Sequence, residues 1–213
     1  MAPSPGKFIT LEGGEGTGKS TQARSLRDAL QQRGLSVLLT REPGGSPGAE
    51  LIRKLLVEGE PGRWDAMSEA LLLFAARRAH LSETIIPALQ RGEWVVCDRF
   101  TDSTYAYQGD AGGLGHTVIH QLAALALDRD SPVPDLTLVL DIPVETGLAR
   151  AALRGGPENR FEKLGADFHQ RLRDSFLQIV RDEPARCVLV DAAPPPEMVA
   201  QAILSVLTSR FGI

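Results

Sequence analysis

Residues 13–20 form a glycine-rich stretch that ends in lysine and serine, with the spacing of a phosphate-binding loop. The residues expected to contact the phosphates are Gly13, Gly14, Glu15, Gly16, Thr17, Gly18, Lys19, Ser20 and Thr21. Glycines let the backbone turn tightly and aim successive N–H groups at an anion. Lys19 is placed to reach the outer phosphates, and the Ser20 hydroxyl to ligate magnesium. A glycine-rich turn that binds nothing is the weaker interpretation, because the motif lies between an apolar run and a helical pattern.

A second acid and base, Asp98 and Arg99, follow the third apolar run of the chain. Asp98 is placed like the second magnesium-organising carboxylate of a nucleotide-transferring site, and Arg99 can bridge donor and acceptor phosphates. Thr104, Tyr107 and Gln108 offer hydroxyl and amide groups to a small polar ligand. A salt bridge at a strand end is the alternative for the pair. The phosphate loop nearby favours the functional interpretation.

The helical pattern from about residue 66 to residue 90 carries one arginine in an apolar stripe. The stripe comprises Met67, Leu71, Phe74, Arg78, Leu81, Ile85 and Ala88. An unpaired buried guanidinium is costly, so Arg78 needs an acceptor outside the helix. With Phe74 one turn earlier, the pair suits a nucleobase; an internal ion pair and ordinary core packing are the alternative. The stripe also suits burial against a second copy, in a homodimer.

A third basic segment, 147–162, carries Arg150, Arg154 and Arg160 around a break of glycines and a proline. Arg150 and Arg154 share one helix face. This composition suits a lid that closes over a triphosphate, excludes water and adds cations where charge develops. A solvated helix end with scattered charges is the alternative.

Five short apolar runs supply the elements that must position these side chains. They span residues 8–11, 35–39, 94–97, 136–140 and 187–190. Strands that are apolar nearly throughout are typical of a parallel sheet covered on both faces. We therefore predict a three-layer α/β fold, with a five-stranded parallel sheet and helices on both faces. Ligands bind at the carboxyl ends of such strands, where Glu12, residues 40–45, Asp98, Asp141 and Asp191 fall.

The length of 213 residues fits a single domain, predicted over 1–213. A formal net charge of -4 disfavours a surface built for a nucleic-acid backbone. The two cysteines, Cys97 and Cys187, fall in predicted buried strands, as core thiols of a reducing cytoplasm do. No apolar run approaches the roughly 20 residues of a membrane span. We expect a cytoplasmic protein that binds neither nucleic acid nor membrane.

From about Lys7 to the C-terminus, the order and spacing of these motifs resemble bacterial thymidylate kinases. The resemblance is carried by the phosphate loop with Glu12 and by residues 40–45, 74–78, 98–109 and 135–141. It implies a phosphate-loop fold like that of nucleoside monophosphate kinases, usually in a homodimer. It also implies that the γ-phosphoryl group of MgATP is transferred to dTMP, giving dTDP and ADP on the way to dTTP.

The resemblance also implies roles for the residues that meet phosphate. Lys19 neutralises the transferring phosphoryl group, and Ser20 holds magnesium. Arg41 and Arg99 grip the dTMP phosphate, and Glu15 lies near the sugar 3′-hydroxyl.

For the nucleoside, the resemblance places Phe74 on the thymine ring and a hydrogen bond from Arg78 on the base. Thr104 and Gln108 match polar positions beside the base. Tyr107 matches a tyrosine against the sugar that disfavours a ribose 2′-hydroxyl.

The phosphate loop contains no arginine while the segment 147–162 has three. The chain is therefore similar to the subtype whose catalytic arginine comes from the lid. Arg154 is predicted in that role, and Arg150 and Arg160 are predicted to contact ATP.

Two other functions remain open on the residues alone. One is a kinase of another nucleoside monophosphate or of a small hydroxylated metabolite. The other is a nucleotide-dependent switch, although the chain has no Asn-Lys-x-Asp motif for guanine.

Overall fold

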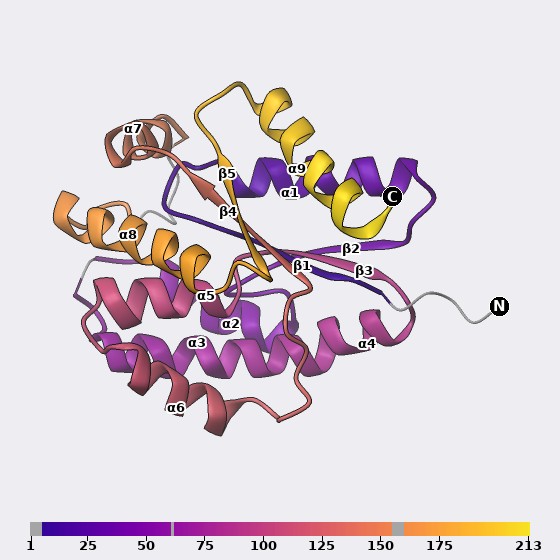
Figure 1. The fold of residues 1–213 in the computed structure, drawn as a ribbon. Helices are drawn as coiled ribbons and strands as arrows, with labels where there is room; N and C mark the ends of the chain where they lie inside the picture. The colour runs from indigo at the N-terminus through magenta and orange to yellow at the C-terminus, as the bar shows by residue number, and fades with distance from the viewer. Residues whose placement is uncertain (1–5, 61, 155–159) are drawn as a thin grey trace.

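The computed structural model describes residues 6–60, 62–154 and 160–213, which contain one sheet of five parallel strands (Figure 1). The strands are β1 (Phe8–Glu12), β2 (Val37–Arg41), β3 (Trp94–Asp98), β4 (Leu136–Asp141) and β5 (Cys187–Asp191). Their order across the sheet is β2-β3-β1-β4-β5. The predicted five-stranded parallel sheet is confirmed. Only β2 is displaced: it begins two residues after the predicted run and continues to Arg41.

The helices occupy the segments between the strands. They are α1 (Lys19–Gln32), α2 (Pro47–Val57), α3 (Ala66–His80), η1 (Leu81–Ile85), α4 (Ile86–Gln90), α5 (Thr101–Thr104), η2 (Tyr105–Ala111), α6 (His116–Ala126), α7 (Val144–Arg154), α8 (Ala166–Asp182) and α9 (Pro196–Phe211). The single helix predicted over 66–90 is continuous in path but contains a π-helical segment, η1, between α3 and α4. η2 is π-helical as well.

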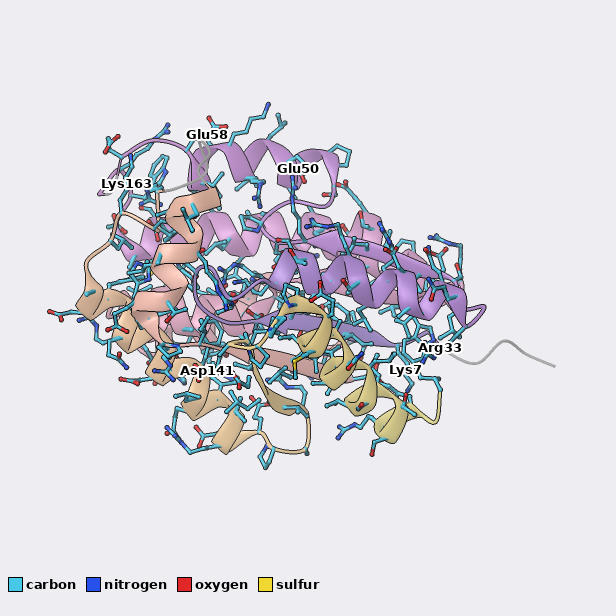
Figure 2. The ribbon with its side chains drawn as sticks, turned by 90° about the horizontal axis from the view of Figure 1, so that it is seen from above. Lys7, Arg33, Glu50, Glu58, Asp141 and Lys163 are labelled. Carbon is cyan, nitrogen blue, oxygen red and sulfur yellow. The ribbon has the colours of Figure 1, made fainter. Side chains whose placement is uncertain are left out.

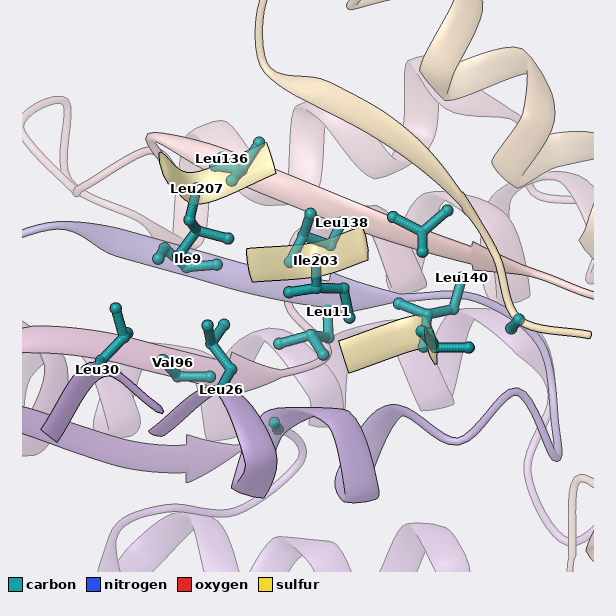
Figure 3. Close-up of a cluster of buried hydrophobic side chains, with 14 of the residues drawn as sticks. Ile9, Leu11, Leu26, Leu30, Val96, Leu136, Leu138, Leu140, Ile203 and Leu207 are labelled. Atoms are coloured by element: carbon teal, nitrogen blue, oxygen red, sulfur yellow. The ribbon is translucent and has the colours of Figure 1, made fainter. Parts of the chain in front are cut away.

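Alternate side chains of the strands enter two different cores, because successive residues of a strand point to opposite faces. Ile9 and Leu11 of β1 pack with α1 and α9, as Figure 3 shows. Phe8 points to the other face and packs with Leu81 and Ile85 of η1. Both faces of β1 are thereby covered, which explains why its sequence is apolar without alternation.

The helices form a layer on each side of the sheet (Figure 1). α1 and α9 cover one face, where Leu26 and Ile203 meet the strand leucines. η1, α4 and α8 cover the other face, where Phe176 of α8 packs near Val139. Charged side chains point outward around these layers, among them Arg33, Glu58 and Lys163 (Figure 2).

The register of the sheet collects polar strand ends at one edge. Asp98, which ends β3, pairs with Leu11 on one side and with Arg41 on the other. Asp141 and Asp191 are paired at the ends of β4 and β5. This is the edge at which open parallel sheets bind ligands.

Within the described residues, no helix combines the length and the apolar character that a membrane crossing requires.

Leu138 in β4 is fully buried, so Leu138→Ala is expected to reduce the free energy of unfolding by about 2–5 kcal/mol, through lost burial and the cavity that remains. Urea unfolding followed by circular dichroism measures the change. Leu125→Ala on α6 is the matched control, because that leucine is 85% exposed. Its expected change is within about 0.5 kcal/mol. Equal effects of the two substitutions would contradict the assignment of the core.

Candidate active site

The glycine-rich loop connects β1 to α1 at the carboxyl edge of the sheet. Gly13, Gly16 and Gly18 have positive φ angles of 133°, 68° and 87°, which side chains with a Cβ rarely adopt. α1 begins directly after Gly18, so its N-terminal N–H groups and the positive end of its dipole face the loop. The loop therefore has the backbone that an anion-binding turn requires.

Glycine is also required where the loop touches the start of α7. A Cβ on Gly16 would collide with the backbone of Gly147, and a Cβ on Gly147 would collide with the carbonyl oxygen of Glu15. The two backbones are thus in direct contact, and the contact joins the phosphate loop to the helix that leads into the segment 147–162.

Lys19 lies folded over the loop. Its Nζ donates to the carbonyl oxygens of Gly13 and Gly14, at 3.1 and 2.7 Å, and to the Thr17 hydroxyl at 3.2 Å. Burial and the nearby Arg99 guanidinium lower the pKa of Lys19 to about 8. An anion beside Nζ would offset both effects, so the lysine is suited to phosphate.

Ser20 and Asp98, the two predicted magnesium ligands, are in contact. The Ser20 hydroxyl donates to the Asp98 carboxylate. Among the residues that the structure describes, no group of three His, Cys, Asp or Glu side chains is placed to hold a metal ion. One hydroxyl and one carboxylate fit magnesium in this setting, since this ion is usually bound by one or two protein oxygens together with water and substrate phosphates.

Arg99 connects the loop to the opposite wall of the site. Its guanidinium donates to Glu15 at 3.1 Å, to the Tyr107 hydroxyl at 2.8 Å and to the Gly13 carbonyl at 3.1 Å. Burial opposes its charge, but Tyr107 and Glu15 outweigh that effect and raise the pKa of Arg99. Its φ of 72° lies in the left-handed region, which costs about 1–3 kcal/mol for a residue with a side chain.

Glu12, at the end of β1, is connected to Arg99 through the Ser103 hydroxyl. Its carboxylate accepts from the backbone N–H of Phe100 at 2.7 Å and from the Ser103 hydroxyl at 2.5 Å. Ser103 in turn accepts from Arg99 at 3.1 Å. Burial and the charge of Asp102 raise the pKa of Glu12 to about 8.

Most of these groups line one cavity of about 700 Å³. The predicted site residues in its wall are Glu15, Gly16, Gly18, Lys19, Ser20, Thr21, Arg41, Asp98, Arg99, Thr104, Tyr107, Gln108 and Arg150. Gly13, Gly14 and Thr17 lie on the other side of the loop, in the wall of a smaller cavity. Most of the predicted site is therefore brought together in space.

The expected position of Arg78 in the pocket is not observed. Its side chain is 55% exposed, donates to the carbonyl oxygen of Ala126 at 2.8 Å and pairs with Asp128 at 3.3 Å. Arg77 lines the cavity instead, together with Leu73, four residues earlier on the same helix face. Sequence reasoning missed both residues because neighbouring arginines lie about 100° apart on a helix, and only the partners of each identify its face.

Phe74 is likewise outside the cavity wall. It packs with Ala70 and Ile119, and its ring lies 5.1 Å from the Arg77 guanidinium. The aromatic ring predicted to stack on a base therefore stacks on an arginine of the pocket.

Two of the three lid arginines have described side chains. Arg150 donates to the carbonyl oxygens of Ala192 and Ala193 at 2.8 and 3.0 Å. Arg160, predicted to contact ATP, is instead buried: it pairs with Glu69 and donates to the Leu56 carbonyl at 3.1 Å.

The acidic partner of Arg160 comes from α3, distant in sequence, so its burial could not be read from the segment 147–162. Arg154 ends α7, and its side chain lies outside the described residues, as do residues 155–159 of the predicted lid.

A parallel sheet whose first strand leads through a glycine-rich loop into a helix, with an arginine-lined pocket in the same cavity, defines a phosphate-loop protein with a nucleoside monophosphate kinase-like fold. The family model for thymidylate kinase matches residues 11–203. The chain belongs to the thymidylate kinase family.

Individual relatives agree over nearly the whole chain. It is 52% identical to thymidylate kinase of Caulobacter vibrioides, covering 98% of this chain and 99% of the relative. It is also 52% identical to thymidylate kinase of Rhizorhabdus wittichii, with 95% and 97% covered. The crystal structure of thymidylate kinase from Ehrlichia chaffeensis matches with a TM-score of 0.77 at 32% identity, over 96% of this chain and 100% of the other.

Glu12→Gln is expected to weaken the dependence of stability on pH. Since the pKa of Glu12 is about 8 in the folded protein and ordinarily 4.5, the folded state binds more protons between these values. The free energy of unfolding contributed by Glu12 therefore falls as pH rises through this window. Urea unfolding at several pH values should give a shallower fall for Glu12→Gln. Glu197→Gln, at an exposed position on α9, should leave the slope unchanged; a slope that is the same in all three proteins would contradict the assignment.

Proposed function

We propose that this protein transfers the γ-phosphoryl group of MgATP to dTMP, giving dTDP and ADP. The observation that carries the proposal is one cavity with the phosphate loop at Lys19 and an acceptor pocket with Arg41, Arg77 and Arg99. Membership of the thymidylate kinase family supports dTMP as the acceptor. The reaction belongs to dTTP synthesis.

The transfer is direct and in line, without a covalent enzyme intermediate. When bound, MgATP would supply the phosphoryl group; Ser20 and Asp98 would hold its magnesium, which would neutralise phosphate charge. Lys19 and Arg99 hold the donor and acceptor phosphates, while Arg41, which pairs with Glu50 at 3.2 Å, completes the acceptor side. Positioning of the two substrates can lower the barrier by about 7–11 kcal/mol.

Thymine is recognised by a donor and an acceptor that the described protein atoms leave unpaired. Nη1 of Arg77 and Oε1 of Gln108 are both buried without a hydrogen-bond partner, and both residues line the cavity. A thymine edge presents carbonyl oxygens next to an N–H group, which complements this pair. We therefore assign to Arg77 the base contact expected of Arg78.

The resemblance to the family supports roles for five further residues. Glu15 lies near the 3′-hydroxyl, and Tyr107, whose hydroxyl donates to Glu15 at 2.6 Å, lies against the sugar. Thr104 stands beside the base. Arg154 supplies the lid's catalytic charge, and Arg150 contacts ATP.

We also propose how the protein is organised and where it works. The chain acts as a single domain over 1–213, with a lid at about 147–162, and works in the cytoplasm without nucleic acid or membrane as a partner.

We further propose a homodimer through α2 and α3. These helices pack together and expose Leu51, Leu55, Met67 and Leu71. Met67 and Leu71 belong to the stripe predicted to bury against a second copy. A cluster of large exposed apolar side chains on two adjacent helices marks an interaction surface, and a two-fold axis lets the same surface meet itself.

ADP formation with MgATP is expected to be greatest with dTMP, compared with dUMP, UMP, dCMP, AMP, GMP and no acceptor. Lys19→Ala should lower the turnover number about 100-fold or more, because it removes a cation from the transferring group, while the circular dichroism spectrum is retained. Preference for another acceptor would identify a different nucleoside monophosphate kinase. Hydrolysis that ignores every acceptor would identify a nucleotide-dependent switch.

Arg77→Gln is expected to raise the Michaelis constant for dTMP about tenfold or more, since a hydrogen bond to a charged group contributes about 1.5–3 kcal/mol. Arg78→Gln, the same substitution at the next residue, should leave it unchanged. Initial rates at saturating MgATP measure both. A larger effect at Arg78 would assign the base contact to Arg78 and not to Arg77.

Leu51→Glu combined with Leu71→Glu is expected to convert the dimer to a monomer, because each substitution would place a charge in the apolar surface. Sedimentation velocity measures the mass. Met198→Glu on α9, exposed in the other helical layer, is the control and should remain dimeric. An unchanged mass in the double variant would reject this face.

A further inference from the structure

We infer that His80 is a positioning residue for recognition of the acceptor base: it fixes Glu42, and Glu42 fixes Arg77 in the cavity. The inference rests on the proposed role of Arg77 in dTMP binding. Neither His80 nor Glu42 contributes the base contact itself, so both act through the orientation of the arginine.

Two of the three guanidinium nitrogens of Arg77 donate hydrogen bonds to neighbouring groups. Its Nε donates to Oε2 of Glu42 at 2.7 Å. Its Nη2 donates to the Phe100 carbonyl at 3.1 Å and to the Thr104 hydroxyl at 3.0 Å. The guanidinium also lies over the rings of Phe74 and Phe100, with centroid distances of 5.1 and 5.2 Å. Among the described residues Nη1 has no partner, and its direction depends on the plane that Glu42 sets together with Phe100 and Thr104.

His80 holds the second oxygen of Glu42. Its Nδ1 lies 3.1 Å from Oε1 of Glu42, and both side chains are buried, at 0% and 4% exposure. Since a carboxylate only accepts hydrogen bonds, Nδ1 is the donor. The carboxylate is thus bound at both oxygens, to two residues one helical turn apart on α3.

The end of β2 and the loop that follows it pack against the imidazole of His80. Nε2 of His80 lies 2.7 Å from the Thr40 hydroxyl, at hydrogen-bond distance. A Cβ on Gly45 would collide with this same nitrogen and with Oγ1 of Thr40. Thr40, Glu42 and Gly45, three residues of one short segment, therefore all meet His80.

A histidine is needed because it donates to Glu42 while its other nitrogen meets Thr40. An apolar side chain at position 80 would leave Oε1 of Glu42 buried without a donor. The carboxylate would then turn to find one, and the fixed plane of Arg77 would be lost. The effect should appear in the affinity for the acceptor, since the phosphate loop and Lys19 belong to other elements.

The test uses His80→Leu and His80→Asn, whose amide nitrogen can replace Nδ1 as the donor to Glu42. Calorimetric titration with dTMP alone gives the dissociation constant, and initial rates give the constants for both substrates. His80→Leu should weaken dTMP binding about tenfold and raise the Michaelis constant for dTMP equally. The Michaelis constant for MgATP and the turnover number should change less than about twofold. His80→Asn should recover most of the affinity.

His120→Asn on α6, an exposed histidine, is the matched control and should behave as wild type. In an Arg77→Gln background, His80→Leu should have no further effect on dTMP binding, because its route to the base is already removed. The melting temperature of each variant shows that the compared proteins are folded.

Unchanged dTMP binding in folded His80→Leu would overturn the inference, and so would an undiminished effect in the Arg77→Gln background. An equal loss of MgATP affinity would reduce His80 to a structural residue and overturn it too. Failure of the proposed function would instead be visible in the wild-type protein, as absent dTMP turnover. If dTMP still binds in that case, the variants test the positioning role independently.

Discussion

Acidic side chains at the carboxyl ends of the strands are removed from water and must be paired with donors. Glu15 and Glu42 follow β1 and β2 at this end of the sheet, and an isolated carboxylate removed from water is costly. Each acid is therefore given a specific donor. Glu15 and Glu42 receive arginines, and these bonds hold Arg99 and Arg77 in single orientations facing the cavity. The same pairs that permit burial thus also build the pocket.

The sheet and the phosphate loop were predictable from the sequence, because their signals are local. Runs without alternation at 8–11 and 136–140 require cover on both faces, and the structure provides it with α1 and α9 on one side and η1, α4 and α8 on the other. The loop motif likewise prescribes its own backbone. Boundaries were less certain, as the later start of β2 shows, because strand ends depend on partners as well as on apolar residues.

The arginines were not predictable in the same way, because the face that each occupies is decided by distant partners. Arg77 is drawn inward by Glu42, 35 residues earlier, while Arg78 reaches the carbonyl of Ala126. A periodic stripe cannot distinguish these neighbours. Arg160 shows the same limit, since Glu69 pairs with it in a different part of the fold. Most other predicted site residues do line the cavity, because they directly follow strands, and the pairing of the strands fixes their positions.

The direct contact between Gly16 and Gly147 has a consequence for divergence within the family. Neither position can accept a side chain unless the backbone opposite moves, although the two lie far apart in the sequence. The two positions are therefore coupled: a side chain at one is tolerated only if the backbone at the other is displaced. Substitutions at these two positions are therefore expected to occur together. A chimaera that exchanges the phosphate loop without α7 would separate the two halves of this contact.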